Sequence, residues 1–420
     1  MSTQPTSTVG AWIGIDWANR THEGVLRLAD GQQERFTLDN QPERLHSWLG
    51  ELRERFAGHT VVIAVEKTRS QLINILVQYS FVQLYLVNPG SVAKYREAFA
   101  PSGAKDDPGD AELILTMVFK HADQLTPWKP DDAQTRLLRG LCEERRHAVD
   151  QRTKLVEELT SKIQRYYPQG IELAGGDLTT TMACDFLCKF PELDAVKKIH
   201  DGTLRKFYYA HNSRNEELIR KRLEQRRNAV AVTEDRAIIE PLKMTVLRIA
   251  QQIRALNASI AGFDQQIATI FPKHPDAAIF ASFPGAGPVL APRLLAEFGT
   301  DRQRYPEVTN LQCRAGIAPV TEKSGNSQWV HRRWRCAKFS LQTFHEYAAS
   351  SLSFSVWAKA YYQYRKDKDR NAKHHTIIRT LAYKWMRILY AAWVTRSAYD
   401  EAAYITALRN RNSPICAYLP

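Results

Sequence analysis

The sequence predicts a fold of the class α/β plus all-α, in which a mixed α/β domain precedes two mainly helical units. Short apolar runs rich in β-branched residues alternate with helical segments over the first third of the 420 residues. Apolar residues then recur at alternating intervals of three and four from Ile239 to Ile270. We expect an α/β domain at 1–130, a long helical coiled-coil domain at 131–271, a mostly helical domain at 272–396 and a tail at 397–420.

The N-terminal domain should begin with three strands, followed by a helix, a strand, a helix, a strand and a helix. The run HTVVIAVE, which ends in Glu66, is rich in β-branched residues and typical of a strand buried on both faces. The turn residues ADG separate the second and third strands, which makes them antiparallel partners. The expected strands are 11–16, 24–29, 34–39, 59–66 and 82–87, the expected helices are 42–56 and 71–79, and a further helix starts within AKDDPGDAELI at 104–114.

The middle of the chain should be elongated and helical. Its three-and-four apolar spacing is an unbroken heptad pattern, which keeps one stripe facing a partner helix. A helix at 133–167 is the natural partner, although Arg145 and Arg152 occupy expected apolar positions in its seam. The two helices can pair within one chain or between chains, and an ordinary bundle helix fits the pattern as well as a coiled coil. Small amphipathic helices should fill the insert at 170–232.

The C-terminal unit opens with a glycine turn. FPGAGPVLAPRLLAEFG, residues 283–299, places Gly285 and Gly287 before an apolar helix. This is the pattern of a helix-hairpin-helix element whose turn amides face a phosphate, although a single Gly-x-Gly is a weak signal. CRAGIAPVTEKSGNSQWVHRRWR follows, and then a basic, aromatic helical region that ends near Arg396.

The formal net charge is +13, and nearly all of the excess lies near the C-terminus. Between residues 311 and 400, 16 Lys and Arg stand against 5 Asp and Glu. Such a segment usually binds a polyanion, because each neutralised phosphate releases counterions; a solvated basic face is the alternative. Aromatic residues among the charges can stack on unpaired bases, although several must belong to the core. They are Trp329, Trp334, Phe339, Trp357, Tyr361, Tyr362 and Tyr364.

Membrane and disulfide classes are not expected. The sequence has no run of eighteen apolar residues and no signal-peptide pattern, which favours a cytoplasmic protein without a membrane partner. Six cysteines are scattered, and only Cys184 and Cys188 are close, without a second pair. This spacing favours reduced thiols over a zinc site or a disulfide framework.

Carboxylates stand where they can converge on one site. Asp16 ends the first strand and Glu66 ends the fourth, and in a sheet of this order these strands lie side by side. A helix packed over the same sheet edge would bring Asp107 and Asp110 there. Converging carboxylates repel one another unless cations lie between them, and Mg²⁺ or Mn²⁺ prefers all-oxygen ligands. Two such ions can clamp a phosphodiester, so these residues predict a ribonuclease H-like nuclease site.

A purely structural interpretation of this stretch stays open. Asp107, Pro108 and Asp110 fit an N-cap, a proline at the first helical position and an acidic residue at N3. A cap can also be a metal ligand, so the two interpretations are compatible.

Together these motifs resemble a known family. GIDWA, VVIAVEKTRS and AKDDPGDAELI resemble the Asp, Glu, Asp-x-x-Asp tetrad of the RuvC-like domain in the insertion sequence 110 (DEDD) transposase family. FPGAGPVLAPRLLAEFG and CRAGIAPVTEKSG resemble that family's C-terminal transposase domain. The resemblance runs from Gly14 to about Trp393, and the ordered combination is highly specific. It implies a RuvC-like nuclease domain at 1–130 whose tetrad binds Mg²⁺ or Mn²⁺.

The chain departs from the family pattern at one position. The family usually has Lys-Thr-Asp where this chain has Lys105, Asp106 and Asp107. Asp106 and Asp107 are both candidate ligands, because spacings of three and four residues to Asp110 each share a helix face. The Asp-x-x-Asp match and the N-cap position favour Asp107.

The resemblance also implies a serine nucleophile. In the family a C-terminal serine attacks DNA and forms a covalent phosphoserine link, and Ser324 of KSG matches it. A serine hydroxyl is a poor nucleophile until its proton is removed or a metal stabilises its alkoxide, so Ser324 would depend on the tetrad. On sequence alone, a Ser-Gly pair in a loop is more often just a turn.

We therefore expect a transposase or recombinase of a bacterial, nucleoid-associated type that cuts and rejoins donor and target DNA. The resemblance implies guidance by a structured bridge RNA and a tetramer that places the tetrad of one chain against the serine of another. The alternatives are a water-using, RuvC-like, junction-resolving endonuclease and a non-enzymatic nucleic-acid-binding protein. The residues expected to contact nucleic acid are Lys323, Arg332, Arg333, Arg335, Lys338, Gly285 and Gly287.

Overall fold

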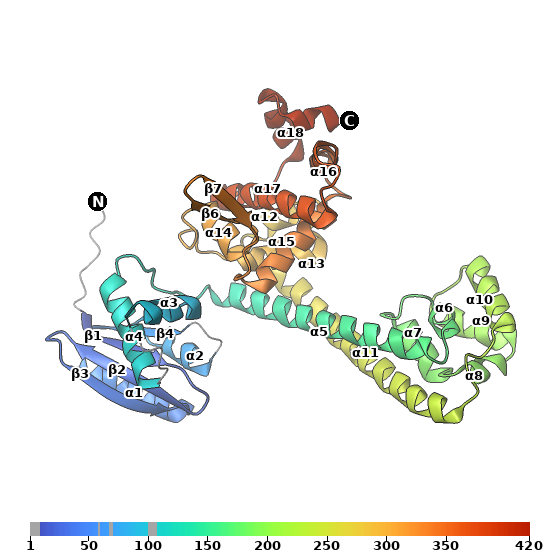
Figure 1. Cartoon of the computed structure of the whole chain (residues 1–420), viewed down its shortest axis with the longest axis horizontal. Coiled ribbons are helices and arrows are strands. Elements are labelled where there is room, and N and C mark those ends of the chain that lie inside the picture. Colours follow the sequence, from blue (N-terminus) through green and yellow to red (C-terminus); the bar gives the residue numbers. More distant parts are fainter. Residues whose placement is uncertain (1–8, 58, 67–69, 100–106) are drawn as a thin grey trace. The chain divides into compact units, whose positions relative to one another are not determined.

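The computed structural model describes residues 9–57, 59–66, 70–99 and 107–420. The chain divides into two compact units, residues 1–130 and residues 131–420. The first unit contains a five-stranded sheet with helices packed on it, and the second is mostly helical (Figure 1). The prediction of an α/β region followed by a mainly helical remainder is confirmed.

The sheet of the first unit mixes antiparallel and parallel pairs. Its order is β3-β2-β1-β4-β5, in which β2 is antiparallel to both β1 and β3, and β4 is parallel to both β1 and β5. The predicted adjacency of the first and fourth strands is confirmed. The strands are β1 (Val9–Asp16), β2 (Thr21–Leu28), β3 (Gln33–Asp39), β4 (Thr60–Glu66) and β5 (Val82–Val87).

Helices cover both faces of this sheet. Alternate side chains of the central strand β4 point to opposite sides, so both faces present apolar residues on which helices can pack. Val61, Ile63 and Val65 of β4 pack with α1 and α2 on one face. Val62 and Ala64 pack with α4 on the other face. The helices of this unit are α1 (Pro42–Arg55), α2 (Gln71–Leu76), α3 (Pro89–Phe99) and α4 (Asp107–His121).

Helix α4 lies in direct backbone contact with β1 at Gly14. A Cβ atom built on Gly14 would lie 2.3 Å from the carbonyl oxygen of Ala111 and 2.6 Å from the backbone nitrogen of Leu115. Nearer the start of β1 and farther along α4, the ring of Trp12 packs edge-on against Phe119 with centroids 5.4 Å apart. These contacts show that α4 runs antiparallel to β1, so the first turn of α4 lies at the Asp16 end of the strand.

The second unit contains two long helices that pair within the chain, α5 (Ala133–Gln164) and α11 (Arg236–Ile270) (Figure 1). The two arginines of the α5 seam have polar partners in α11. Arg145 Nε donates to Asp264 Oδ1, and Arg152 Nη1 donates to Asn257 Oδ1 at 2.8 Å. Short helices form the expected insert between α5 and α11. They are α6 (Gln169–Leu173), α7 (Thr181–Lys189), α8 (Leu193–Lys197), α9 (Asp201–Ala210) and α10 (Glu216–Asn228).

The rest of the second unit is built on a core rich in tryptophan, with Trp357, Trp385 and Trp393 fully buried. Residues 397–420, for which the sequence predicts no structure, form two helices and contribute Leu408 and Ile415 to this core. Among the described residues, no helix has both the length and the apolar character of a membrane span. The elements here are η1 (Phe271–Lys273), α12 (Ala277–Ala281), α13 (Gly287–Phe298), α14 (Val308–Arg314), β6 (Val320–Ser324), β7 (Ser327–His331), α15 (Lys338–Ser351), α16 (Val356–Lys368), α17 (His374–Thr395), α18 (Glu401–Asn410) and η2 (Pro414–Tyr418).

Candidate functional site

Asp16 and Glu66 end adjacent parallel strands at the same level. The register between β1 and β4 runs as far as the pair Ile15 and Val65, so Asp16 and Glu66 are the next residues on each strand. Neighbouring strands lie about 4.8 Å apart. Side chains alternate along a strand, and Gly14 and Ala64 face α4. Asp16 and Glu66 therefore project to the face that α4 covers.

The first turn of α4 brings Asp110 to this end of the sheet. Asp110 directly precedes Ala111, which contacts β1 at Gly14. Asp110 is 7% exposed. Asp107 is the first residue of α4, but its side chain lies outside the described part of the chain, as does the whole of Asp106. The strand ends and the helix turn thus gather at one edge of the sheet.

Asp110 has a cationic partner that the sequence analysis missed. Arg96 of α3 donates to Asp110 Oδ1 from Nε at 2.9 Å and also from Nη2. The side chains of Arg96 and Asp110 are 23% and 9% exposed, so the pair is largely shielded from water. No motif marks Arg96, because this contact depends on how α3 packs against α4.

The described carboxylates do not by themselves form a metal cage. No group of three or more His, Cys, Asp and Glu side chains is placed to hold a metal ion within the described ranges, which omit the side chain of Asp107. The donor set is nevertheless all-oxygen, which suits Mg²⁺ or Mn²⁺. The guanidinium of Arg96 supplies the positive charge at Asp110 that a cation would otherwise supply.

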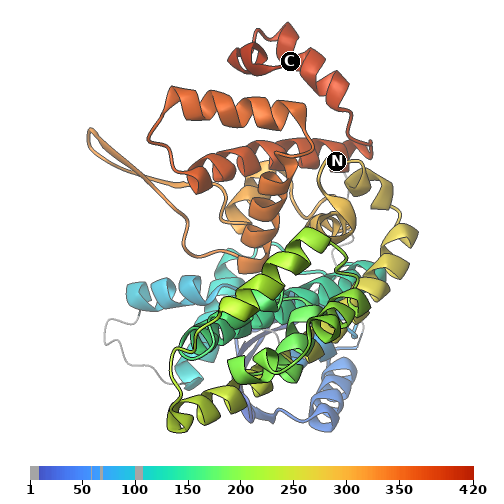
Figure 2. The ribbon, with the colours of Figure 1, turned by 90° about the vertical axis from the view of Figure 1, so that its right-hand side faces the viewer.

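Ser324 lies at the tip of an exposed two-stranded hairpin. It ends β6 and pairs with Ser327 at the start of β7, and Gly325 between them has a φ of +56°. The hairpin extends away from the helical core of the second unit (Figure 2). Ser324 is exposed, and no hydrogen bond of its hydroxyl is found with any described residue. The hydroxyl is accessible and has no hydrogen bond to a base among the described residues, and Asp16, Glu66 and Asp110 belong to the other compact unit.

The hairpin and the segment after it present cations together with exposed aromatic rings. Lys323, Arg332, Arg335 and Lys338 are exposed, whereas Arg333 is half-buried. Trp329 and Trp334 are 64% and 67% exposed, and the Arg332 guanidinium lies 5.0 Å from the Trp334 ring centre. In contrast, Trp357 and Tyr361 belong to the core. Exposed tryptophans beside arginines form a surface suited to nucleic acid.

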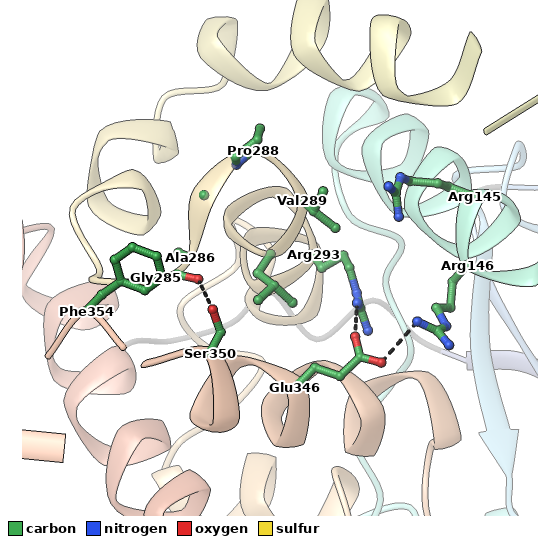
Figure 3. A pocket seen from close by; sticks show the side chains of 12 residues that line it. Arg145, Arg146, Gly285, Ala286, Pro288, Val289, Arg293, Glu346, Ser350 and Phe354 are labelled. Carbon is green, nitrogen blue, oxygen red and sulfur yellow. Dashed lines mark hydrogen bonds and ion pairs between the residues drawn. The ribbon is translucent and has the colours of Figure 1, made fainter. Parts of the chain in front are cut away.

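The glycine turn before α13 lines a cavity of about 490 Å³ (Figure 3). Gly285 and Gly287 have φ values of +77° and +54°, which favour glycine. A hydrogen bond of 2.9 Å from Ser350 Oγ to the carbonyl oxygen of Gly285 holds the turn against α15.

Three arginines face this turn against a single lining carboxylate (Figure 3). Arg146 Nη1 donates to Glu346 Oε1 at 3.0 Å, and Arg293 Nη1 donates to Glu346 Oε2. Arg293 is 2% exposed, yet its Nη2 is buried without a hydrogen-bond partner. Arg145 completes the lining. Each of these arginines has a carboxylate partner, since Arg145 pairs with Asp264 and Arg146 also pairs with Asp150. The feature that suits a phosphate group is therefore the orphaned guanidinium nitrogen of Arg293 beside the first turn of α13.

Comparisons with known proteins agree over both units. A family model described as a transposase, of the IS110 DEDD type, matches residues 13–168, and a model of the IS116/IS110/IS902 transposase family matches residues 277–363. A Streptomyces coelicolor mini-circle protein named as a transposase for IS117 is 26% identical over 93% of this chain and 95% of its own length. The IS900 42 kDa protein of Mycobacterium paratuberculosis is 25% identical over 94% and 98% of the two chains. The IS116 44.8 kDa protein of Streptomyces clavuligerus is 23% identical over 94% and 97%.

Proposed function

Because the chain belongs to the IS110 family of insertion-element transposases, we propose that it cuts and rejoins DNA strands through a covalent phosphoserine intermediate. The observation that carries this proposal is the position of Asp16 and Glu66 at adjacent strand ends, on the face where α4 brings Asp110. The strand order and the helix placement support a ribonuclease H-like, RuvC-like nuclease domain. The break between the compact units at residue 130 supports a domain boundary there, and the boundaries at 271 and 396 stay proposals from the sequence.

Asp16, Glu66, Asp107 and Asp110 are the proposed ligands of Mg²⁺ or Mn²⁺. When bound, the metal supplies Lewis acidity that stabilises negative charge on the phosphodiester oxygens. Without a bound cation, these carboxylates would repel a phosphate group. DNA should therefore bind at this site only when the metal is bound. Arg96 holds Asp110 through Oδ1 alone and competes with the cation for the negative charge of this carboxylate.

Ser324 is the proposed nucleophile. Its oxygen forms a bond to phosphorus, the bond from phosphorus to the sugar oxygen breaks, and the serine proton passes through a base to the leaving sugar oxygen. Since no base contacts Ser324 among the described residues, a carboxylate of the tetrad is the natural acceptor. The exposed hairpin tip suits a hydroxyl that must be presented to a separate acidic site.

The basic, aromatic surface of the second unit supports binding of donor and target DNA. Lys323, Arg332 and Arg335 are exposed there beside two exposed tryptophans, and the glycine turn offers a further phosphate site. The resemblance to the family adds two finer proposals: guidance by a structured RNA, and a tetramer in which one chain's carboxylates serve another chain's serine. Sequencing the nucleic acid that co-purifies with the protein tests the first, because a recurring structured RNA complementary to two DNA sites is expected.

Trapping the protein–DNA adduct tests the chemistry. The wild-type protein with Mg²⁺ and element-end DNA should form an adduct that resists denaturation, and Ser324→Ala and Asp16→Asn should not. Ser327→Ala is the matched control, since it removes the hydroxyl directly across the hairpin from Ser324. Cleaved DNA without an adduct in wild type, or undiminished cleavage in Ser324→Ala, would favour the water-using endonuclease instead.

A further inference from the structure

A cleft of about 1020 Å³ opens at the base of the β6–β7 hairpin. Its walls come from β7, from α17 and from α18, which are distant in the sequence. The hairpin is anchored beside it, because the backbone nitrogen of Ala337 donates to the carbonyl oxygen of Arg314 at 3.0 Å. Gly316 has a φ of +69°, and a Cβ atom there would lie 2.5 Å from Cys336 Sγ. The cleft is therefore part of the packed structure and not a gap beside a loose hairpin.

The lining of this cleft is strongly cationic and contains no Asp or Glu. Six cationic side chains contribute to it, and within the described ranges none of them forms an ion pair with a carboxylate. They are Arg332, Arg333, Arg379, Lys384, Arg387 and Arg411. Three of them, Arg333, Arg379 and Lys384, are half-buried, whereas Arg332, Arg387 and Arg411 are exposed. The half-buried cations lack a carboxylate partner among the described residues, unlike the buried Arg293, which pairs with Glu346, and this favours an anion from outside the chain in the cleft.

The cations in the cleft are also close enough to affect one another. Burial and the charge of Arg332 lower the pKa of Arg379. Burial and the charges of Arg387 and Arg365 lower the pKa of Lys384. In addition, Nε of Arg333 and Nε of Arg379 are buried without hydrogen-bond partners. Mutual repulsion and unsatisfied donors both cost free energy, and bound phosphate groups would relieve both.

Part of the cleft wall is apolar and aromatic. The half-buried Tyr383, Tyr404 and Ile388 line it, and the core residues Tyr361 and Leu408 also contribute to its lining. The Lys384 ammonium lies 5.2 Å from the centre of the Tyr361 ring. Rings and apolar side chains beside unpaired cations form the combination that holds single-stranded nucleic acid, since bases stack on the rings while phosphates meet the charges. A base inside a duplex cannot reach such a wall.

We propose that this cleft binds an unpaired segment of nucleic acid, with at least one base against the tyrosine wall and its phosphates on the surrounding cations. This inference rests on the proposed function, which brings DNA strands and structured RNA to the chain. Unpaired nucleotides occur in a strand that is being exchanged and in loops of a folded RNA. The lining chemistry suits both sources, and the binding assay below separates them.

The test is fluorescence anisotropy with full-length Ser324→Ala protein and labelled 12-nucleotide probes: single-stranded DNA, single-stranded RNA and the matching DNA duplex. Arg411→Gln should weaken single-strand binding by roughly tenfold and reduce the slope of log affinity against log salt by about 0.7. Arg409→Gln is the matched control, because it removes the same charge from an exposed site on α18 that does not line the cleft. Ala391→Trp fills the cleft from an exposed position on α17 without changing charge.

The expected result is that Ala391→Trp weakens single-strand binding at least tenfold through loss of base stacking and leaves duplex binding unchanged. The tighter of the two single-stranded probes identifies the natural source. The inference is overturned if Arg411→Gln and Arg409→Gln change single-strand affinity equally and Ala391→Trp binds the single-stranded probes as tightly as the Ser324→Ala parent. The assay needs no cleavage, so its result is independent of the adduct experiment, and failure of this inference can be distinguished from failure of the proposed function.

Discussion

Replacing Gly14 with alanine should displace the first turn of α4 and lower DNA cleavage by about a hundredfold. The added Cβ would lie 2.3 Å from the Ala111 carbonyl oxygen, whereas ordinary contacts begin near 3.4 Å. The atoms in its way are backbone atoms, so the helix must lift by about 1 Å, and misplacement of that size costs roughly 10²-fold in rate. The overpacking itself should cost about 1–3 kcal/mol of stability.

Two measurements check this prediction. The rate of adduct formation reports the position of the carboxylates, and hydrogen–deuterium exchange of peptides from α4 reports how firmly the helix is held on the sheet. Gly50→Ala is the matched control, because a Cβ atom there meets nothing within 4 Å and Gly50 lies inside α1. That change should leave the rate unaltered and stabilise the unit by about 0.5–1 kcal/mol.

The outcome that refutes the reasoning is a Gly14→Ala protein with wild-type rate and wild-type protection of α4. Such a protein would mean that α4 is not held against β1 at this position. The convergence of Asp110 on Asp16 and Glu66 would then lose its structural basis.

Three further changes test other contacts. Arg96→Ala removes the guanidinium partner of Asp110, so Mn²⁺ affinity in calorimetry should rise roughly tenfold, as a hydrogen bond to a charged group is worth about 1.5–3 kcal/mol. Arg35→Ala, which breaks the exposed ion pair between Arg35 of β3 and Glu112 of α4, should have no effect. Asp132→Ala removes the N-cap of α5 and should cost about 1 kcal/mol in urea denaturation at pH 7. Burial would raise the pKa of Asp132, but hydrogen bonds from threonine hydroxyls hold it at about 2, so this stabilisation should be complete above pH 4 and disappear as the pH falls through 2. Ile253→Ala, in the fully buried α11 stripe, should cost about 2–5 kcal/mol by the same assay.

Local patterns predicted individual elements of both units. The β-branched run at 59–66 became β4, buried on both faces, and the apolar spacing of α11 became a buried stripe facing α5. These predictions succeed because side-chain period and burial are linked within a single element. Whether α11 pairs within the chain or between chains could not be predicted, since the stripe is complementary to any apolar helix face. Arg145 and Arg152, poor seam residues by pattern, found partners only through three-dimensional packing.

By itself the sequence determined which strands lie together, which face each presents and the carboxylates at the strand ends, because these follow from residue spacing along one chain. Only the tertiary structure decided that Gly14 lets α4 pack with its first turn at Asp16, that Arg96 pairs with Asp110, and that unpaired cations of α17 and of the segments after β7 and α18 surround one cleft. The physical reason is that these contacts join residues with no fixed sequence separation. Their energies depend on packing and on local charge, which no linear pattern records.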